Sequence, residues 1–220
     1  LKGQGKYEAS ETLINELIDG NPYSCAYWNQ LTQIQFLRND VQGAITSSEY
    51  ALAINPNDEE ALLNKANGLF SLDNFVESLK YYQQYRQTCH HVDFSIIDVT
   101  IGHLYLILGQ PKEALDFYFQ SITESENKDQ ALINVAISIF DNGYFELTYR
   151  ILINYLPNAA KDWTEGFAYL ARCCYELKKT KEYKQFLQIA IERNPRECQD
   201  VLSDLYPPET EIKDYPSINI

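Results

Sequence analysis

The sequence predicts an all-α protein in which pairs of helices stack into a right-handed α-α superhelix, or solenoid. Three observations predict this fold class. A compact residue recurs every 34 to 36 residues, a residue that tolerates left-handed backbone recurs at the same spacing, and Asn-Pro pairs close several of the periods. A fixed period of this length is the signature of stacked helical repeats. Each unit of such a stack buries its apolar face against its neighbours, so we expect one array.

The first recurring column lies in the second helix expected in each unit. Its members are Ser10, Ala44, Ser78, Ala114, Thr148 and Tyr183, at spacings of 34, 34, 36, 34 and 35 residues. Tyr183 is much larger than the other members, and the joint at residues 88–95 is two residues longer than the period. Both departures predict local changes in helix packing.

A second column predicts the turn inside each helix pair, and a third predicts where the two helices approach closely. The turn column is Gly5, Asn39, Asp73, Gly109, Gly143 and Lys178. Gly, Asn and Asp tolerate the left-handed backbone that ends a helix. The third column is Thr32, Ala66, Gly102, Ala136 and Ala171, and its small side chains predict core positions of each first helix. Proline cannot continue a helix, so Pro22, Pro56 and Pro195, each after an asparagine, predict joints between units.

These columns predict eleven helices and a final short one. The ranges are 7–19, 25–38, 41–54, 59–71, 75–88, 93–108, 111–124, 129–141, 145–156, 161–177, 180–193 and 196–205. The last range would cover the apolar end of the array with Val201, Leu202 and Leu205, as a capping helix does. Residues 207–220 contain two prolines in succession at the start and lack periodicity, so we expect an extended tail.

The residues of segment 25–58 resemble a tetratricopeptide repeat, a helix-turn-helix unit of 34 residues. Trp28, Leu31, Ala44, Ala51 and Pro56 stand at the family's large, large, small, small and proline positions. Thr32 replaces the usual glycine and Ser48 the usual aromatic residue. The resemblance covers residues 3–195 and implies about five and a half units: a partial first unit, then 25–58, 59–92, 95–128, 129–162 and 164–197. The array would occupy residues 1–206.

Composition and charge narrow the class of partner. With 18 basic and 31 acidic residues, the net charge of −13 repels a phosphate backbone, so we expect no binding to nucleic acid. No stretch is long and apolar enough to be a membrane span. The five cysteines are odd in number and lack C-x-x-C spacing, which favours reduced, buried thiols and, by default, a cytoplasmic protein.

No group of residues predicts catalysis, a cofactor or a metal. Cys89, His90, His91 and Asp93 form the one cluster with metal-binding side chains, but zinc needs about four ligands and other candidates are remote in sequence. Cys173 and Cys174 lie two periods from His103, too far for a nucleophile and base pair. The acidic residues Asp58, Glu59 and Glu60 begin an expected helix and suit capping. We therefore expect a protein that is not an enzyme.

The resemblance implies that the first helix of each unit lines a concave groove. By that correspondence, the candidate partner-binding residues are Asn29, Gln33, Phe36, Leu63, Asn67, Phe70, Val99, His103, Leu106, Ile133, Ile137, Phe140, Arg172 and Tyr175. The middle of this set is apolar, which is typical of an interaction site. In the competing interpretation the apolar members are core. Asn29, Asn67 and His103 are favoured as groove residues because burying them unpaired would cost about 1–3 kcal/mol each.

The predicted function is a scaffold that binds a protein or peptide in the concave groove. Arg172 is the only basic residue at the groove positions that the resemblance gives. Four acidic residues also occupy such positions: Glu60, Asp141, Glu165 and Glu176. The ligand is therefore expected to be apolar or basic rather than acidic. Two alternatives stay open. The chain is a self-assembling module that forms homo-oligomers, or it is the repeat portion of a larger protein whose activity lies elsewhere.

Overall fold

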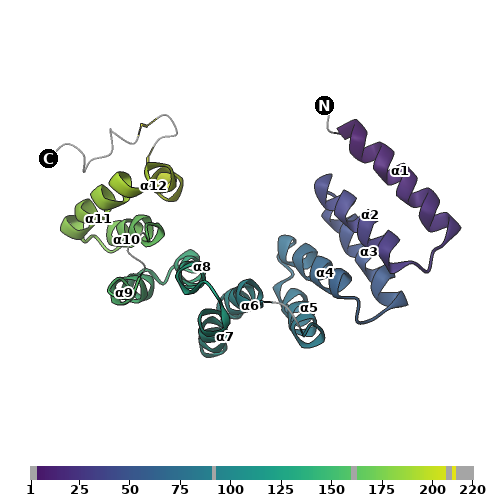
Figure 1. The fold of residues 1–220 in the computed structure, drawn as a ribbon, viewed down its shortest axis with the longest axis horizontal. Helices are drawn as coiled ribbons and strands as arrows, with labels where there is room; N and C mark the ends of the chain where they lie inside the picture. The colour runs from purple at the N-terminus through teal and green to yellow at the C-terminus, as the bar shows by residue number, and fades with distance from the viewer. Residues whose placement is uncertain (1–3, 91–92, 160–162, 207–209, 212–220) are drawn as a thin grey trace. The chain divides into compact units, whose positions relative to one another are not determined.

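The computed structural model describes residues 4–90, 93–159, 163–206 and 210–211, and these form an all-α structure (Figure 1). The α-helices are α1 (Gln4–Gly20), α2 (Cys25–Leu37), α3 (Val41–Ile54), α4 (Glu59–Ser71), α5 (Phe75–Thr88), α6 (Ser95–Ile107), α7 (Pro111–Glu124), α8 (Lys128–Asp141), α9 (Phe145–Tyr155), α10 (Glu165–Glu176), α11 (Thr180–Arg193) and α12 (Pro195–Leu202). A 3₁₀ turn, η1 (Ser203–Leu205), follows α12. The predicted tail at residues 207–220 lies almost wholly outside the described residues.

The helices pair into hairpins, and the chain divides into two compact units. Unit 1 comprises residues 1–97 and 107–111, and unit 2 comprises residues 98–106 and 112–220. We call α2, α4, α6, α8 and α10 first helices, because each precedes its hairpin turn. The helices that follow the turns, α3, α5, α7, α9 and α11, are second helices, and the sequence columns place α1 with them.

In unit 1, consecutive helices pack side by side from α1 to α5. The second helix α3 lies between two first helices, because it contacts both α2 and α4. Helix α1 buries Ile14 and Ile18 against Leu31 of α2. The core of this unit continues through Leu62 of α4 to Tyr85 of α5. Each helix therefore covers the apolar face of the next, as in a repeat array.

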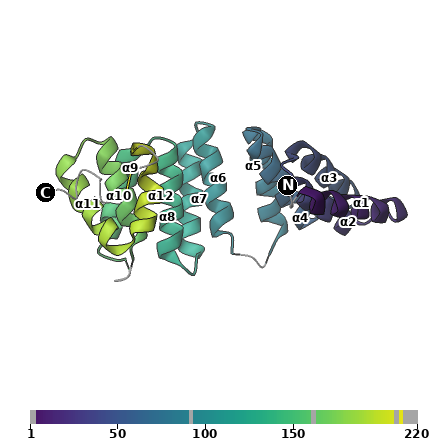
Figure 2. The same cartoon turned by 90° about the horizontal axis from the view of Figure 1, so that it is seen from above.

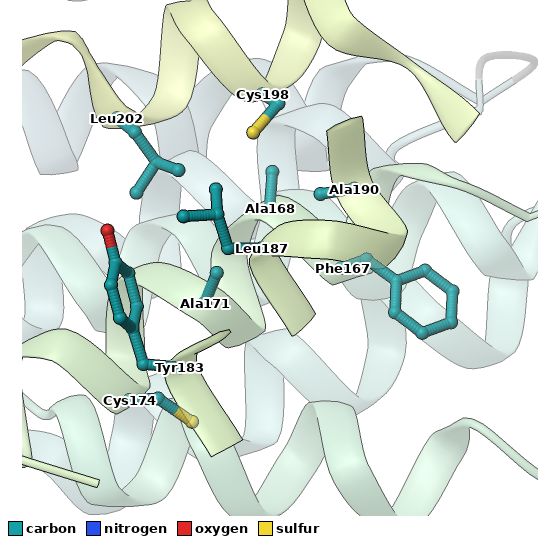
Figure 3. Packing of buried hydrophobic residues seen from close by; sticks show 9 residues of the cluster. All are labelled: Phe167, Ala168, Ala171, Cys174, Tyr183, Leu187, Ala190, Cys198 and Leu202. Carbon is teal, nitrogen blue, oxygen red and sulfur yellow. The ribbon is translucent and has the colours of Figure 1, made fainter. Parts of the chain in front are cut away.

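Unit 2 is built in the same way, and Figure 2 shows its later helices side by side. Helix α9 contacts α8 and α10, and α11 contacts α10 and α12. Figure 3 shows Cys198 and Leu202 of α12 pointing toward Leu187 of α11 and the alanines of α10. Val201 and Leu205 pack against the same cluster. The predicted capping helix is confirmed, and it begins at Pro195 with Asn194 as its N-cap, whose side chain accepts a hydrogen bond from the backbone of Glu197.

The predicted turns adopt the left-handed backbone that ends a helix. Asn39, Asp73 and Lys178 have φ of 62°, 57° and 57°, and Gly109 and Gly143 have φ of 73° and 81°. The amide after each of three of these residues closes the Schellman hydrogen bond: Asp40 donates to Gln35, Asn74 to Leu69, and Lys179 to Cys174, at 2.8 to 2.9 Å. This motif satisfies carbonyl groups that the helix end leaves unpaired.

Close helix approach occurs where the small-residue column predicts it. Thr32, Ala66, Ala136 and Ala171 are fully buried. A Cβ atom at Gly102 would lie 2.5 Å from the ring of Tyr118, so only glycine fits beside that tyrosine. Within the α2–α3 hairpin, Thr32 faces Ser48 instead, with their hydroxyl oxygens 3.4 Å apart. The larger residue in α2 is thus accommodated by a smaller one in α3.

Three expectations near the ends of helices are corrected. Gly5 is not a turn residue, since α1 begins at Gln4 and runs through it. Ser10 is exposed, unlike Ala44 and the later members of its column, because no described helix covers that face of α1. Helix α10 begins at Glu165 rather than near residue 161, after Trp163 has packed against the Leu132 cluster.

Candidate functional site

The candidate residues lie on the first helices, and in unit 1 the polar ones are hydrogen-bonded to neighbouring elements. Asn29 of α2 is buried, and its Nδ2 donates to the carboxylate of Asp58 at 2.8 Å. Gln33, also on α2, donates to Glu60 of α4 at 2.9 Å. The side-chain oxygen of Asn67 accepts from the Tyr82 hydroxyl at 2.5 Å. These side chains link adjacent helices. Asn67 is nonetheless exposed, while Asn29 is buried with its Oδ1 lacking a hydrogen-bond partner among the described residues.

His103 of α6 belongs to a polar cluster in unit 2. Its Nδ1 lies 3.0 Å from Ser138 Oγ and 3.0 Å from Asn142 Nδ2. Asn142 Nδ2 also donates to the carbonyl of Ser138 at 2.8 Å, which fixes the amide as a donor. Since an amide nitrogen cannot accept a hydrogen bond, Nδ1 of His103 is the acceptor and the imidazole is neutral. Burial lowers the pKa of His103, while the nearby Asp141 charge opposes that shift.

The Tyr118 hydroxyl completes this cluster at 2.6 Å from Ser138 Oγ. Burial raises the pKa of Tyr118 to about 12, with the Ser138 hydrogen bond acting in the opposite direction. Tyr118, Ser138 and Asn142 were absent from the predicted set. None of these three residues belongs to a recurring column of the repeat, so the sequence pattern gives no reason to group them with His103.

Arg172 of α10 is mostly enclosed by its neighbours. Its Nη2 pairs with Glu176 at 3.1 Å and with Asp204 of η1 at 3.5 Å, and its guanidinium carbon lies 5.7 Å from the centre of the Phe140 ring. Its Nε and Nη1 atoms are buried without a hydrogen-bond partner among the described residues. The 3₁₀ turn η1, which follows the capping helix α12, therefore contributes a carboxylate beside the first helix α10.

Five apolar candidates belong to core clusters. Leu63 packs against the Leu62 cluster in unit 1. In unit 2, Val99 and Leu106 pack against the Tyr118 cluster. Ile133 and Ile137 belong with Leu132, and Ile133 is only 3% exposed. Ile133 and the buried Asn29 are therefore corrected to packing residues, because a ligand on the surface does not reach them.

Four aromatic candidates are placed differently. Phe36, Phe70 and Phe140 are half-buried, and Tyr175 is 47% exposed. The ring of Phe70 meets that of Phe75 edge-on at 5.7 Å. Phe140 is flanked by Phe145 at 4.9 Å and by Tyr169 at 6.5 Å. These contacts hold the rings in position while part of each surface stays accessible.

Tyr175 also lines a hollow in unit 2. This hollow, of about 500 Å³, lies between the end of α10 and the start of α11 and is lined by Cys174, Tyr175, Glu176, Lys178, Thr180, Tyr183 and Lys184. The rings of Tyr175 and Tyr183 meet at 5.7 Å. Tyr183, the largest member of its column, is a core residue whose hydroxyl contacts that of Tyr206.

The thiols are poor nucleophiles for a physical reason. Burial raises the pKa of Cys173 to about 12 and that of Cys174 to about 11. A thiol with such a pKa is protonated at neutral pH, and the thiolate is the reactive form. Cys89 is buried beside Tyr85, while His90 is exposed and His91 lies outside the described residues. Within the described ranges, no three His, Cys, Asp or Glu residues gather as metal ligands.

A search of the described helices finds none that is both long enough and apolar enough to cross a membrane.

Comparison with known proteins supports the fold. No family model matches the chain. Anaphase-promoting complex subunit 7 of Dictyostelium discoideum is 25% identical over 128 residues, which is 57% of this chain and 22% of that protein. The chain thus matches only about a fifth of the length of this curated relative.

Two solved structures are similar over most of the chain. PilW, described as a widely conserved type IV pilus biogenesis factor, aligns with a TM-score of 0.67 at 17% identity, covering 91% of this chain and 92% of its own. YrrB, described as a TPR protein with an unusual peptide-binding site, aligns with a TM-score of 0.57 at 13% identity, covering 88% and 98%. The repeat columns, the left-handed hairpin turns and these likenesses all indicate the same fold. The chain has the fold of tetratricopeptide-repeat proteins.

Proposed function

We propose that the chain is a non-catalytic scaffold whose first-helix faces bind a peptide or a partner helix. The observation that carries the proposal is the position of Phe140. Its ring is held by Phe145, Tyr169 and Arg172, yet part of its surface stays accessible on a first helix. A large ring that is fixed before binding loses little entropy on contact, which is why aromatic side chains dominate interaction sites.

Phe70 is the counterpart of Phe140 in unit 1. It occupies the same place near the end of its first helix and meets Phe75, as Phe140 meets Phe145. The hairpins thus repeat one aromatic anchor in the two units. An amphipathic helix or extended apolar segment offers side chains at intervals that suit such anchors.

The charges near these anchors favour an apolar or basic ligand. Glu60 accepts a hydrogen bond from Gln33, and Glu176 pairs with Arg172, so both carboxylates stay beside the first-helix faces. Burial raises the pKa of Asp141, an effect that the nearby His103 opposes. The net charge of −13 disfavours nucleic acid as a ligand.

The test replaces both anchors and compares them with a matched phenylalanine elsewhere. Phe70→Ala with Phe140→Ala should abolish recovery of bound proteins by the tagged chain from its native cell extract, while the far-ultraviolet circular dichroism stays unchanged. The control is Phe119→Ala, since Phe119 is 69% exposed on the second helix α7. Equal recovery by the double variant and the control would refute binding at these faces. Loss of helical signal would show that the two rings are core.

A second candidate is that the chain is a repeat segment of a subunit in a large assembly. The sequence likeness to an anaphase-promoting complex subunit favours it. On this proposal, the protein in native extract should sediment within a complex much larger than its own 25.5 kDa, and cross-linking should identify the same neighbours in repeated preparations. Sedimentation as a free chain at native concentration would exclude it.

A further inference from the structure

The hollow of about 500 Å³ between the end of α10 and the start of α11 combines an aromatic wall with a basic rim. We call it the α10–α11 hollow. Two of its lining residues, Cys174 and Tyr183, are buried members of the Leu187 cluster and form its inner side (Figure 3). Tyr175 is 47% exposed, and its ring meets that of Tyr183 at 5.7 Å. The hollow therefore offers a positioned ring to an aromatic side chain that enters it.

Lysines gather at this hollow although the chain as a whole is acidic. Within seven consecutive residues the sequence has four lysines: Lys178, Lys179, Lys181 and Lys184. Lys178 and Lys184 line the hollow. The ammonium of Lys179 is engaged by other groups, because it lies 3.9 Å from Glu146 and 4.3 Å from the centre of the Tyr149 ring. Among the residues that the structure describes, no carboxylate forms an ion pair with Lys178 or Lys184.

The carboxylates nearby do not cancel this positive charge. Between residues 174 and 184 there are two, Glu176 and Glu182, against the four lysines. Glu176 lines the hollow but is already paired with Arg172 at 3.1 Å. At an ionic strength of about 0.15 M, charges more than about 8 Å apart are largely screened. The lysines at the rim, rather than the net charge of −13, therefore determine which ligand charge the hollow favours.

The backbone at Lys178 is a further sign that its side chain has a use. Its φ of 57° is in the left-handed region, which is costly for a residue with a Cβ atom. The equivalent turns carry residues that tolerate this conformation: Asn39, Asp73, Gly109 and Gly143. Strained residues occur preferentially at functional sites. A role in binding at the rim of the hollow accounts for a lysine at this turn.

A second hollow shows that the accessible apolar surface continues past the end of α10. It measures about 450 Å³ and is lined by Gly143, Tyr144, Phe145, Glu146, Leu147, Arg150 and Leu177. Tyr144 and Leu147 are 45% and 41% exposed, while Glu146 and Arg150 pair with each other at 3.3 Å. Leu177 lines this second hollow and the next residue lines the α10–α11 hollow, so the two flank the end of α10. A surface of this extent suits a segment of polypeptide better than one small molecule.

We propose that the α10–α11 hollow binds an acidic segment of a partner protein, with an aromatic side chain of that segment against Tyr175 and its carboxylates beside Lys178 and Lys184. The opposite charges of the segment and the rim provide the specificity. This site differs from the first-helix faces of the proposed function in both place and preference, because those faces are proposed to take an apolar or basic ligand through Phe70 and Phe140.

The binding test uses the whole 220-residue chain and three labelled synthetic peptides of equal length. The first carries one phenylalanine flanked by glutamates, the second has glutamines in place of the glutamates, and the third has alanine in place of the phenylalanine. We expect fluorescence anisotropy to show that the first peptide binds at least about tenfold more tightly than either of the others. Equal binding of the first and second peptides, equal binding of the first and third, or binding of none would overturn the proposal.

Variants of the chain locate the binding. Lys178→Gly with Lys184→Gln should abolish the preference for the glutamate peptide over the glutamine peptide, and the glycine relieves the strained turn, so loss of the preference is not a consequence of unfolding. The control is Lys112→Gln with Lys128→Gln, two exposed lysines of unit 2 outside the hollow, and it should keep the preference. Tyr175→Ala should weaken binding of the glutamate peptide at least about tenfold, as loss of an aromatic anchor does. A preference that survives the Lys178 and Lys184 changes would refute the site.

A last variant tests whether the chain itself supplies the acidic segment. Residues 207–220 include Glu209, Glu211, Asp214 and Tyr215, which have the chemistry proposed for the partner. Replacing the three acidic residues by glutamine should leave binding of the glutamate peptide unchanged. If that variant bound the peptide at least about tenfold more tightly, residues 207–220 would be the occupant of the hollow, and the proposal of a partner protein would be wrong.

Discussion

At the scale of single residues, the hairpins are held together by size-matched pairs sixteen positions apart. The pairs are Thr32 with Ser48, Gly102 with Tyr118, Ala136 with Leu152, and Ala171 with Leu187. Where the first helix has glycine, the second has a tyrosine, and where it has threonine, the second has only a serine. Close-packed interiors penalise both voids and overlaps, so the two members of a pair must change together.

This matching predicts a coupling between Gly102 and Tyr118. Gly102→Ala should lower the free energy of unfolding by about 1–3 kcal/mol, because the new methyl group overlaps a ring that Ser138 anchors. The gain in helix propensity, about 1 kcal/mol, offsets only part of this loss. Urea denaturation followed by circular dichroism measures the change.

A double-mutant cycle provides the control for that coupling. Gly102→Ala with Tyr118→Leu reproduces the Ala136 and Leu152 pair of the next hairpin, which already shares one core cluster. The double variant should therefore be more stable than the sum of the two single changes implies. Strict additivity of the three measured values would contradict size matching.

The neutral state of His103 predicts a pH dependence of stability. Burial lowers its pKa in the folded chain below the ordinary value of 6.5, so the unfolded chain takes up the proton first as pH falls. Stability is therefore unaffected above about pH 6.5, declines as pH falls below it, and levels off beneath the folded-state pKa. Protonation would also turn Nδ1 into a donor facing the donating amide of Asn142.

The measurement compares the wild type with His103→Gln, whose amide oxygen can accept from Asn142 but does not titrate. This comparison is needed because Glu197, whose pKa burial and the Glu165 charge raise to about 6, gives a dependence of opposite sign. Unfolding free energies of the two proteins should converge as pH falls from 8 toward 5, pH values that bracket the ordinary histidine pKa of about 6.5. A constant difference would contradict the assignment.

At the scale of helices and turns, Lys178 occupies a position that suits glycine. Its φ of 57° costs an L-residue with a Cβ atom about 1 kcal/mol, whereas Gly109 and Gly143 adopt the same conformation in the equivalent turns without that cost. Lys178→Gly should raise the thermal midpoint in a calorimetric scan, and Gly143→Ala should lower it. Gln185→Gly, inside α11, is the control and should destabilise, since glycine in a helix interior loses more entropy on folding.

Most of the helices and turns could be predicted from the sequence because they follow local rules. Five of six turn residues have left-handed backbone, and α3, α4, α5, α7 and α11 have the predicted bounds. Gly5 was misassigned because the column alone cannot distinguish a turn glycine from one in a helix. Periodicity depends on neighbours in sequence, so it finds elements more reliably than their first residues.

The candidate site was less predictable because its polar contacts span hairpins. Gln33 meets Glu60, and His103 meets Asn142, and in both pairs the second residue belongs to the following repeat. A repeat position shows that a residue faces another first helix, but not whether its hydrogen bonds are already satisfied. The repeat position also gives Phe140, whose ring is partly accessible near the end of its first helix, and its role in binding stays a prediction.

At the scale of the whole molecule, the excess of acidic residues should govern how partners approach. A net charge of −13 attracts basic ligands and accelerates their encounter, and dissolved salt screens this attraction. Binding of a basic peptide should weaken several-fold between about 0.05 M and about 0.5 M salt, with most of the loss in the association rate. Stopped-flow measurement of both rate constants tests this, and a salt-independent association rate would contradict it.

The size-matched pairs also limit how this chain could be recombined. Grafting α7 behind α2 would bring the phenol of Tyr118 against the branched side chain of Thr32, although each helix suits its original companion. A graft of the complete α6–α7 segment carries both halves of the match and avoids that collision. For duplication during evolution, or for shuffling in the laboratory, the hairpin is therefore the smallest interchangeable part.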